Sequence, residues 1–170
     1  LNLFDKRKPY TQLPDELKRD IKAFFGDYRT LQQQAISLLY AIASPQQIAA
    51  ACLLAHQQLP ASLLFADHSL LLHKRYINML PALLRVYVGA ASQLYGELDE
   101  IDVIKIHIQS GKVSLMGYDD FEHPIPYLRE RVKIKMAEQD VDFFDYVDEQ
   151  RRPPLLNKSY LIPAQHPDFP

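Results

Sequence analysis

The stretch IKIHIQSGKVSLMGYDDFEHPIPYLRERVKIK, residues 104–135, decides the fold class. Isoleucine alternates with polar residues before the Ser-Gly pair, and valine and leucine resume the alternation after it. Since successive side chains on a strand point to opposite faces of a sheet, this pattern predicts an antiparallel hairpin. A two-residue turn would place Ile108 opposite Val113 and Ile106 opposite Leu115.

A third strand follows, in which a basic residue occupies every second position. We expect it to pair, through a four-residue loop, with a fourth strand so that Met136 lies opposite Val141. The same register places Asp145 on the apolar face, where it needs either a buried partner or a slip in register. The polar face would carry Arg129, Arg131, Lys133, Lys135, Asp142, Phe144 and Tyr146.

Cations interleaved with aromatic rings on an open sheet face are typical of platforms that bind single-stranded nucleic acid. In the predicted register Lys133 faces Phe144, and Arg131 faces Tyr146, so the sequence predicts phosphate contacts and base stacking there. The alternative is a solvated sheet face, in which Lys135 pairs with Asp142 and aliphatic stems cover the rings.

The first hundred residues are expected to be mainly helical. Proline or a capping side chain opens each helix, and glycine ends the first and the last. The apolar stripe of the first helix includes Phe24 and Phe25, and that of the third includes Cys52 as a core residue. Residues 59–72 are irregular and are predicted to be a loop with a short extended piece. The four predicted helices lie at 14–25, 28–42, 45–55 and 81–95.

These elements predict one α+β domain over residues 1–170. A layer of four helices over 1–100 would pack on an antiparallel sheet of about four strands over 101–150. The last twenty residues, 151–170, contain five of the chain's twelve prolines and are expected to form an extended tail over the fold. A chain of 170 residues is long enough to bury a sizeable core.

Charge and composition narrow the possible functions. The net charge of −2 argues against a protein that binds nucleic acid with its whole surface, but it allows a local basic patch.

A single cysteine excludes an intrachain disulfide and fits the reducing cytoplasm, and no apolar run is long enough to cross a membrane. With five glycines there is no glycine-rich phosphate loop, so we expect no cofactor. Because the chain begins with leucine, we expect it to be a piece of a longer protein.

An acidic segment links the second and third strands. Asp119, Asp120 and His123 lie within five residues of one another, and carboxylates with an imidazole are candidate ligands of a divalent metal. A metal site needs ligands that converge from several elements, whereas aspartate before a proline-rich turn is more often a local cap. We therefore interpret the segment as a structural turn, with a metal-dependent nuclease or hydrolase as the alternative.

Several motifs occur in an order that resembles one protein family. They are LPDELKRDIKAFFGDY at 13–28, LPALLRVYVG at 80–89, GKVS at 111–114, YDDF at 118–121, HP at 123–124, DY at 145–146 and PPLL at 153–156. Together they span nearly the whole chain, which is similar to the C-terminal region of the DNA phosphorothioation-associated putative methyltransferase family. The resemblance implies a bacterial, cytoplasmic protein linked to DNA modification and restriction.

Two departures limit what the resemblance implies. The family's methyltransferase domain carries a cofactor loop of the Asp-Tyr-Gly-Cys-Gly type, and this chain contains none, so methyl transfer is not assigned to these residues. The family's basic runs are represented only in part, and the residues that would provide secondary DNA contacts are His73, Lys74, Arg75 and Lys158.

The sequence thus predicts a non-catalytic accessory module of a DNA-modification methyltransferase, which engages DNA or a partner protein of DNA modification or restriction. A metal-dependent nuclease using the acidic segment is one alternative. A scaffold that docks a partner subunit is the other, and a large exposed apolar patch without a basic patch would favour it.

Overall fold

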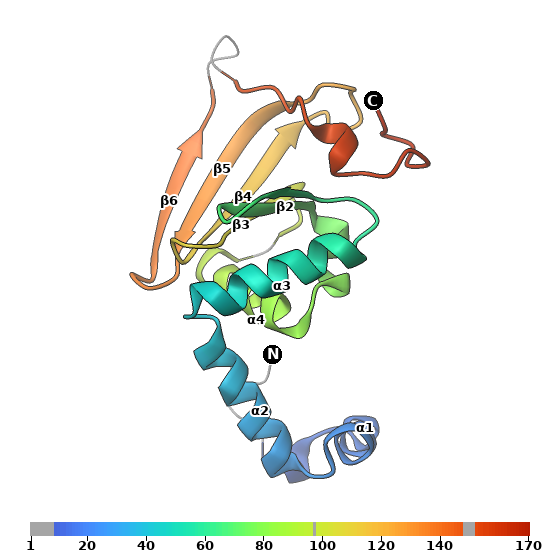
Figure 1. Ribbon diagram of the computed structural model, residues 1–170, viewed down its shortest axis with the longest axis vertical. Helices are drawn as coiled ribbons and strands as arrows, with labels where there is room; N and C mark the ends of the chain where they lie inside the picture. Colours follow the sequence, from blue (N-terminus) through green and yellow to red (C-terminus); the bar gives the residue numbers. More distant parts are fainter. Residues whose placement is uncertain (1–8, 97, 148–151) are drawn as a thin grey trace.

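The computed structural model describes residues 9–96, 98–147 and 152–170. At its centre is an antiparallel sheet whose six strands are neighbours in chain order, β1-β2-β3-β4-β5-β6. Helices α3 and α4 cover one face of the sheet, while the C-terminal segment lies against the other (Figure 1). The predicted α+β class is confirmed; the described residues form four α-helices and a larger sheet than expected.

The four α-helices begin and end close to where the sequence predicts. Asp27 caps α2, since its carboxylate accepts a hydrogen bond of 2.7 Å from the Thr30 backbone N–H. Ser44 caps α3 in the same way, and Gly26 ends α1 at a φ of 78°, which glycine adopts without strain. The helices are α1 (Asp15–Phe25), α2 (Tyr28–Ala41), α3 (Pro45–Gln58) and α4 (Ala82–Tyr95), with 3₁₀ turns at η1 (Tyr10–Gln12), η2 (Lys74–Met79) and η4 (Lys158–Tyr160).

The prediction of a loop with one short extended piece over residues 59–72 is wrong in extent, because this region forms β1 and most of β2. Leu70 and Leu72 point to the helix-covered face, while Leu71 contacts the cluster on the other face. A strand that is apolar on both faces lacks the alternation that marks a half-buried strand. The strands are β1 (Leu63–Phe65), β2 (Ser69–His73), β3 (Val103–His107), β4 (Lys112–Asp119), β5 (Tyr127–Lys135) and β6 (Asp140–Asp145).

Both predicted hairpins are shifted by two residues. Ile106, not Ile108, lies opposite Val113, and Ile134, not Met136, lies opposite Val141. In the first hairpin His107 pairs with Lys112, so the turn spans four residues instead of two. In the second, Lys135 pairs with Asp140, so the four-residue turn begins one residue earlier than predicted. A shift of two does not exchange the two faces, so the side chains keep their predicted faces up to the irregularity between Gly117 and Tyr118.

Asp145 is the one residue of the sheet for which the sequence predicts a buried carboxylate or a slip in register. It lies opposite Glu130 at the end of β6, and its side chain is exposed. The strand ends at this residue, so the carboxylate reaches solvent and needs no buried partner.

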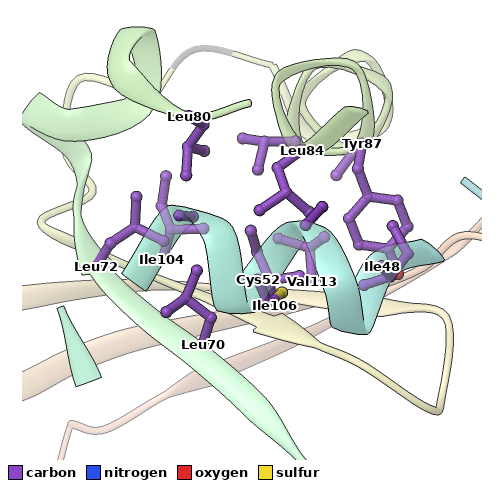
Figure 2. Packing of buried hydrophobic residues seen from close by; sticks show 14 of the residues in the cluster. Ile48, Cys52, Leu70, Leu72, Leu80, Leu84, Tyr87, Ile104, Ile106 and Val113 are labelled. Atoms are coloured by element: carbon purple, nitrogen blue, oxygen red, sulfur yellow. The ribbon is translucent and has the colours of Figure 1, made fainter. Parts of the chain in front are cut away.

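The main core lies between the sheet and helices α3 and α4 (Figure 2). Cys52 of α3, Leu84 of α4 and Ile106 of β3 are all fully buried there. Burial in this apolar setting raises the pKa of the Cys52 thiol to about 12, which agrees with a packing role for the cysteine.

Helices α1 and α2 do not join this layer, which corrects the prediction that all four helices pack on the sheet. They form a pair that projects away from the body of the molecule (Figure 1). Ile21 is the only buried residue described in α1, α2 contains none, and Phe24 is 80% exposed. Within the described ranges no single helix is long and apolar enough to cross a membrane; α2 and α3 meet that criterion only as a pair bent by 102°.

The C-terminal segment, described from residue 152, covers one end of the second sheet face. Leu155 and Leu161 pack there against Val103 and Met116, which forms a second, smaller apolar cluster. The predicted position of the tail over the fold is therefore confirmed for these residues, although a 3₁₀ turn interrupts its extended course.

The two packing environments predict opposite results for two truncations. Leu84→Ala should lower the free energy of unfolding by about 2–5 kcal/mol, because it leaves a cavity in the core. Phe24→Ala should change it by less than about 0.5 kcal/mol, because the ring is mostly exposed. Urea denaturation measures both, and an equal loss in the two variants would contradict the placement of α1 outside the core.

Candidate nucleic-acid interface

The part of the second sheet face that the C-terminal segment leaves uncovered is basic. Lys105 on β3 lies opposite Ser114 on β4, which in turn lies opposite Lys133 on β5. Ser114 is only 2% exposed, so the longer side chains around it close over it. In the next row across the same strands, His107 lies opposite Lys112.

Phe144 on β6 forms the aromatic edge of this surface. Arg131 lies directly opposite it, with the guanidinium carbon 4.6 Å from the ring centroid. The Lys133 ammonium lies 5.6 Å from the same centroid. The predicted contact between Lys133 and Phe144 therefore exists as a diagonal one, whereas the predicted pairing of Arg131 with Tyr146 is wrong because of the two-residue shift.

Lys105, Arg131 and Lys133 form what we call the basic cluster. Within the described part of the chain, none of the three has a carboxylate within ion-pair distance. Burial and then the charges of Arg131 and Lys133 lower the pKa of Lys105. The buried Nε of Arg131 also has no hydrogen-bond partner among the described residues. The cluster thus holds positive charge that the fold itself does not neutralise.

Arg129 is not part of this surface, which corrects the prediction that four basic residues share one face. The register shifts between Gly117 and Tyr118, and this bulge turns the Arg129 side chain toward two glutamates. Its guanidinium donates hydrogen bonds of 2.7 Å to Glu130 and 3.3 Å to Glu100. A Cβ at Gly117 would come within 2.8 Å of the Glu100 carbonyl, so glycine leaves the space that this ion pair occupies.

Lys135 continues the basic stripe but its charge is already neutralised. The ammonium lies 2.9 Å from Asp142 and 3.0 Å from Asp140. The hydrogen bond to Asp142, followed by that to Asp140, raises the pKa of Lys135. The predicted pair of Lys135 with Asp142 is confirmed, and it leaves Lys133 without the carboxylate that lies opposite it in the ladder.

Tyr146 belongs to the covered end of the face. Its side chain packs on the second apolar cluster, and its backbone carbonyl accepts a hydrogen bond of 2.7 Å from Arg152. It therefore does not extend the surface formed by Phe144 and the basic cluster.

The four residues predicted as secondary DNA contacts have separate environments. His73 is partly buried beside Phe121, and burial, followed by the charge of Arg75, lowers its pKa to about 4. The Lys74 ammonium donates to the Asp99 carbonyl, while Arg75 is exposed. Lys158 is 1% exposed, so a phosphate cannot reach it and its predicted contact with DNA is wrong.

The acidic segment forms a turn beside a pocket. Asp119, Asp120 and His123 line a cavity of about 420 Å³ together with Arg152. Asp119 forms an ion pair with Arg152, and the Asp120 carbonyl accepts the His123 N–H at 2.9 Å. Among the described residues, no group of three or more His, Cys, Asp or Glu side chains is placed to hold a metal ion. The geometry agrees with the predicted turn and gives the nuclease alternative no support.

Sequence reasoning missed Lys105, His107 and Lys112 as members of the basic surface. The alternation over residues 104–108 places Lys105 and His107 on the polar face of the first hairpin. If the predicted strands are placed side by side in chain order, the polar face of the first hairpin lies next to the basic strand, β5. The strands of the structure have this order.

No protein-family model, curated protein or solved structure matches the chain. The resemblance to the phosphorothioation-associated family therefore stays an expectation from sequence motifs.

His107 makes the stability of this surface depend on pH. Its Nε2 lies 3.0 Å from the Ser114 hydroxyl, and its ring is 6.0 Å from that of His68. Burial, and then the charges of Lys105, His68, Lys133 and Lys112, lower the pKa of His107 from 6.5 to about 4. The imidazole is therefore neutral at pH 7 in the folded chain.

We expect the free energy of unfolding to fall between pH 7 and pH 5. The unfolded chain binds protons at His73 and His107 below pH 6.5, whereas the folded chain binds them only near pH 4. With allowance for solvent screening, each histidine should contribute about 1 kcal/mol to this loss. Urea denaturation at the two pH values should show a smaller loss in His107→Gln than in the native chain, and an identical loss would contradict the assignment.

Proposed function

We propose that this chain is a non-catalytic module that binds DNA through the uncovered half of its second sheet face. The observation that carries the proposal is the basic cluster, in which three cations lie together without a carboxylate partner among the described residues. Like charges that lie close together on one face of a sheet repel each other, so such a cluster costs stability in the free protein. An anionic polymer that neutralises all three would remove that cost.

Phosphates are the expected partners of Lys105, Arg131 and Lys133. Lys105 on β3 and Lys133 on β5 lie on either side of Ser114, and Arg131 lies two positions before Lys133, so the charges are spread over two strands rather than along one. A backbone with regularly spaced phosphates fits such a spread better than a single carboxylate does. His107 is neutral at pH 7 and would serve as a hydrogen-bonding group rather than as a fourth charge.

Single-stranded DNA fits the surface best. Phe144 lies at the edge of the cluster, and unstacked bases can lie against an aromatic ring or against the guanidinium plane of Arg131. The ring also holds the Arg131 guanidinium on the open face at a distance of 4.6 Å.

The motif resemblance gives this binding a biological setting. In a DNA-modification methyltransferase, methyl transfer would belong to a separate domain, because this chain contains no cofactor loop. The module described here would then hold DNA near that domain or near a restriction protein. Arg75, which is exposed on η2, is a further candidate for contact with the backbone.

Fluorescence anisotropy with a labelled single-stranded 20-mer tests the proposal. We expect binding that weakens as salt is raised, with Lys133→Ala and Arg131→Ala each lowering the affinity about three- to tenfold and reducing the salt slope by about 0.7. Duplex DNA of the same sequence should bind more weakly, because its bases remain stacked.

Lys135→Ala is the matched control. It removes the same charge from the same strand, but that charge is already paired with Asp140 and Asp142. It should therefore change the affinity much less than Lys133→Ala does. Either equal effects of the two substitutions, or no salt-sensitive binding at low ionic strength, would refute the proposal.

A further inference from the structure

We infer that the chain has a second binding site, for a small neutral and mainly apolar molecule that carries one hydrogen-bond acceptor oxygen. The site is a pocket of about 460 Å³ between the end of α2, the start of α3, the middle of α4 and the loops after β3 and β5. It is separate from the basic cluster and does not depend on the DNA-binding proposal. Its volume lies within the range of roughly 300–1,000 Å³ that small-molecule sites occupy.

Tyr87 is the residue that points to a ligand. It is 1% exposed and lines the pocket, and among the described residues its hydroxyl has no hydrogen-bond partner. Figure 2 shows its ring beside Ile48, another residue of the lining. A buried hydroxyl is nearly always hydrogen-bonded in a folded protein, because an unsatisfied one is destabilising. A hydroxyl without a partner at the wall of a pocket is therefore a donor for whatever the pocket binds.

The remaining lining sets the chemical class of the ligand. Aliphatic and thioether side chains form most of the wall, including Leu39, Ile42 and Met136. The polar side chains of the lining other than Tyr87 are Gln109 and Ser110, which are exposed, and no charged side chain takes part. A charged ligand would lose its hydration without gaining a counter-charge, so a neutral one is favoured. Burial raises the pKa of the Tyr87 hydroxyl, which keeps it protonated as a donor.

Two matched probes test the inference on the full chain. 4-Fluoroacetophenone carries a carbonyl acceptor, and 1-ethyl-4-fluorobenzene has nearly the same shape without one. Labelling methionine methyl groups with ¹³C gives one reporter in the pocket, Met136, and two outside its lining, Met79 and Met116. Titration of each probe followed by NMR then reports both the affinity and the place of binding.

We expect both probes to shift the Met136 methyl signal in a saturable way and to leave Met79 and Met116 unchanged. The ketone should bind about three- to tenfold more tightly than the hydrocarbon, and Tyr87→Phe should abolish that preference without weakening the hydrocarbon. Ala137→Leu, a substitution at an exposed position of the lining, should weaken both probes. Its thermal melting curve will show that the fold is retained.

Two results would overturn the inference. One is the absence of saturable shifts at Met136 with either probe in the native chain. The other is a ketone preference that survives in Tyr87→Phe, because the hydroxyl would then not be the donor. Since Tyr87→Phe removes a hydroxyl without a protein partner, the variant is expected to melt at or above the temperature of the native chain.

Discussion

The buried ammonium of Lys158 determines how much of the sheet's second face remains open. It donates hydrogen bonds of 2.8 Å to the His123 carbonyl and 3.4 Å to the Glu122 carbonyl, and it lies 5.0 Å from the Phe121 ring. Burial of an ammonium is unfavourable unless acceptors replace its water, and here backbone carbonyls do so. These bonds attach the C-terminal segment to the connector between β4 and β5, so its leucines cover one end of the face and leave the other end exposed.

The basic side chains lie on the second face of the sheet because the first face is filled by the core. One face must take the large aliphatic side chains that pack on α3 and α4, so alternation sends Lys105, Lys133 and Arg131 to the other. Carboxylates on β6 neutralise Lys135 instead of Lys133, although Asp142 lies opposite Lys133. The result is a sheet that packs on helices with one face and, on the other, carries charge that no described carboxylate neutralises, an arrangement that the proposed DNA binding would explain.

Local features of the structure could be predicted from sequence, and features that join distant segments could not. The helix caps at Asp27 and Ser44 depend on neighbouring residues, and the face of a strand residue follows from alternation wherever the strand has no bulge. Register failed by two residues because alternation alone does not determine where a turn begins or how many residues it contains. Arg129 left the stripe because of a bulge at Gly117, and the carbonyls that bury Lys158 lie 35 and 36 positions before it.

The central claim is that the positive charges of the basic cluster bind an anionic ligand and do not stabilise the fold. The unfolding free energy of Lys133→Gln, measured against the native chain at low ionic strength with and without a single-stranded oligonucleotide, tests it most directly. Alone, the variant should be more stable by a few tenths of a kcal/mol up to about 1 kcal/mol, because like-charge repulsion is relieved. With the oligonucleotide, the order should reverse, since the native chain gains more from binding. A variant that is less stable on its own would show that Lys133 serves the fold and would contradict the claim.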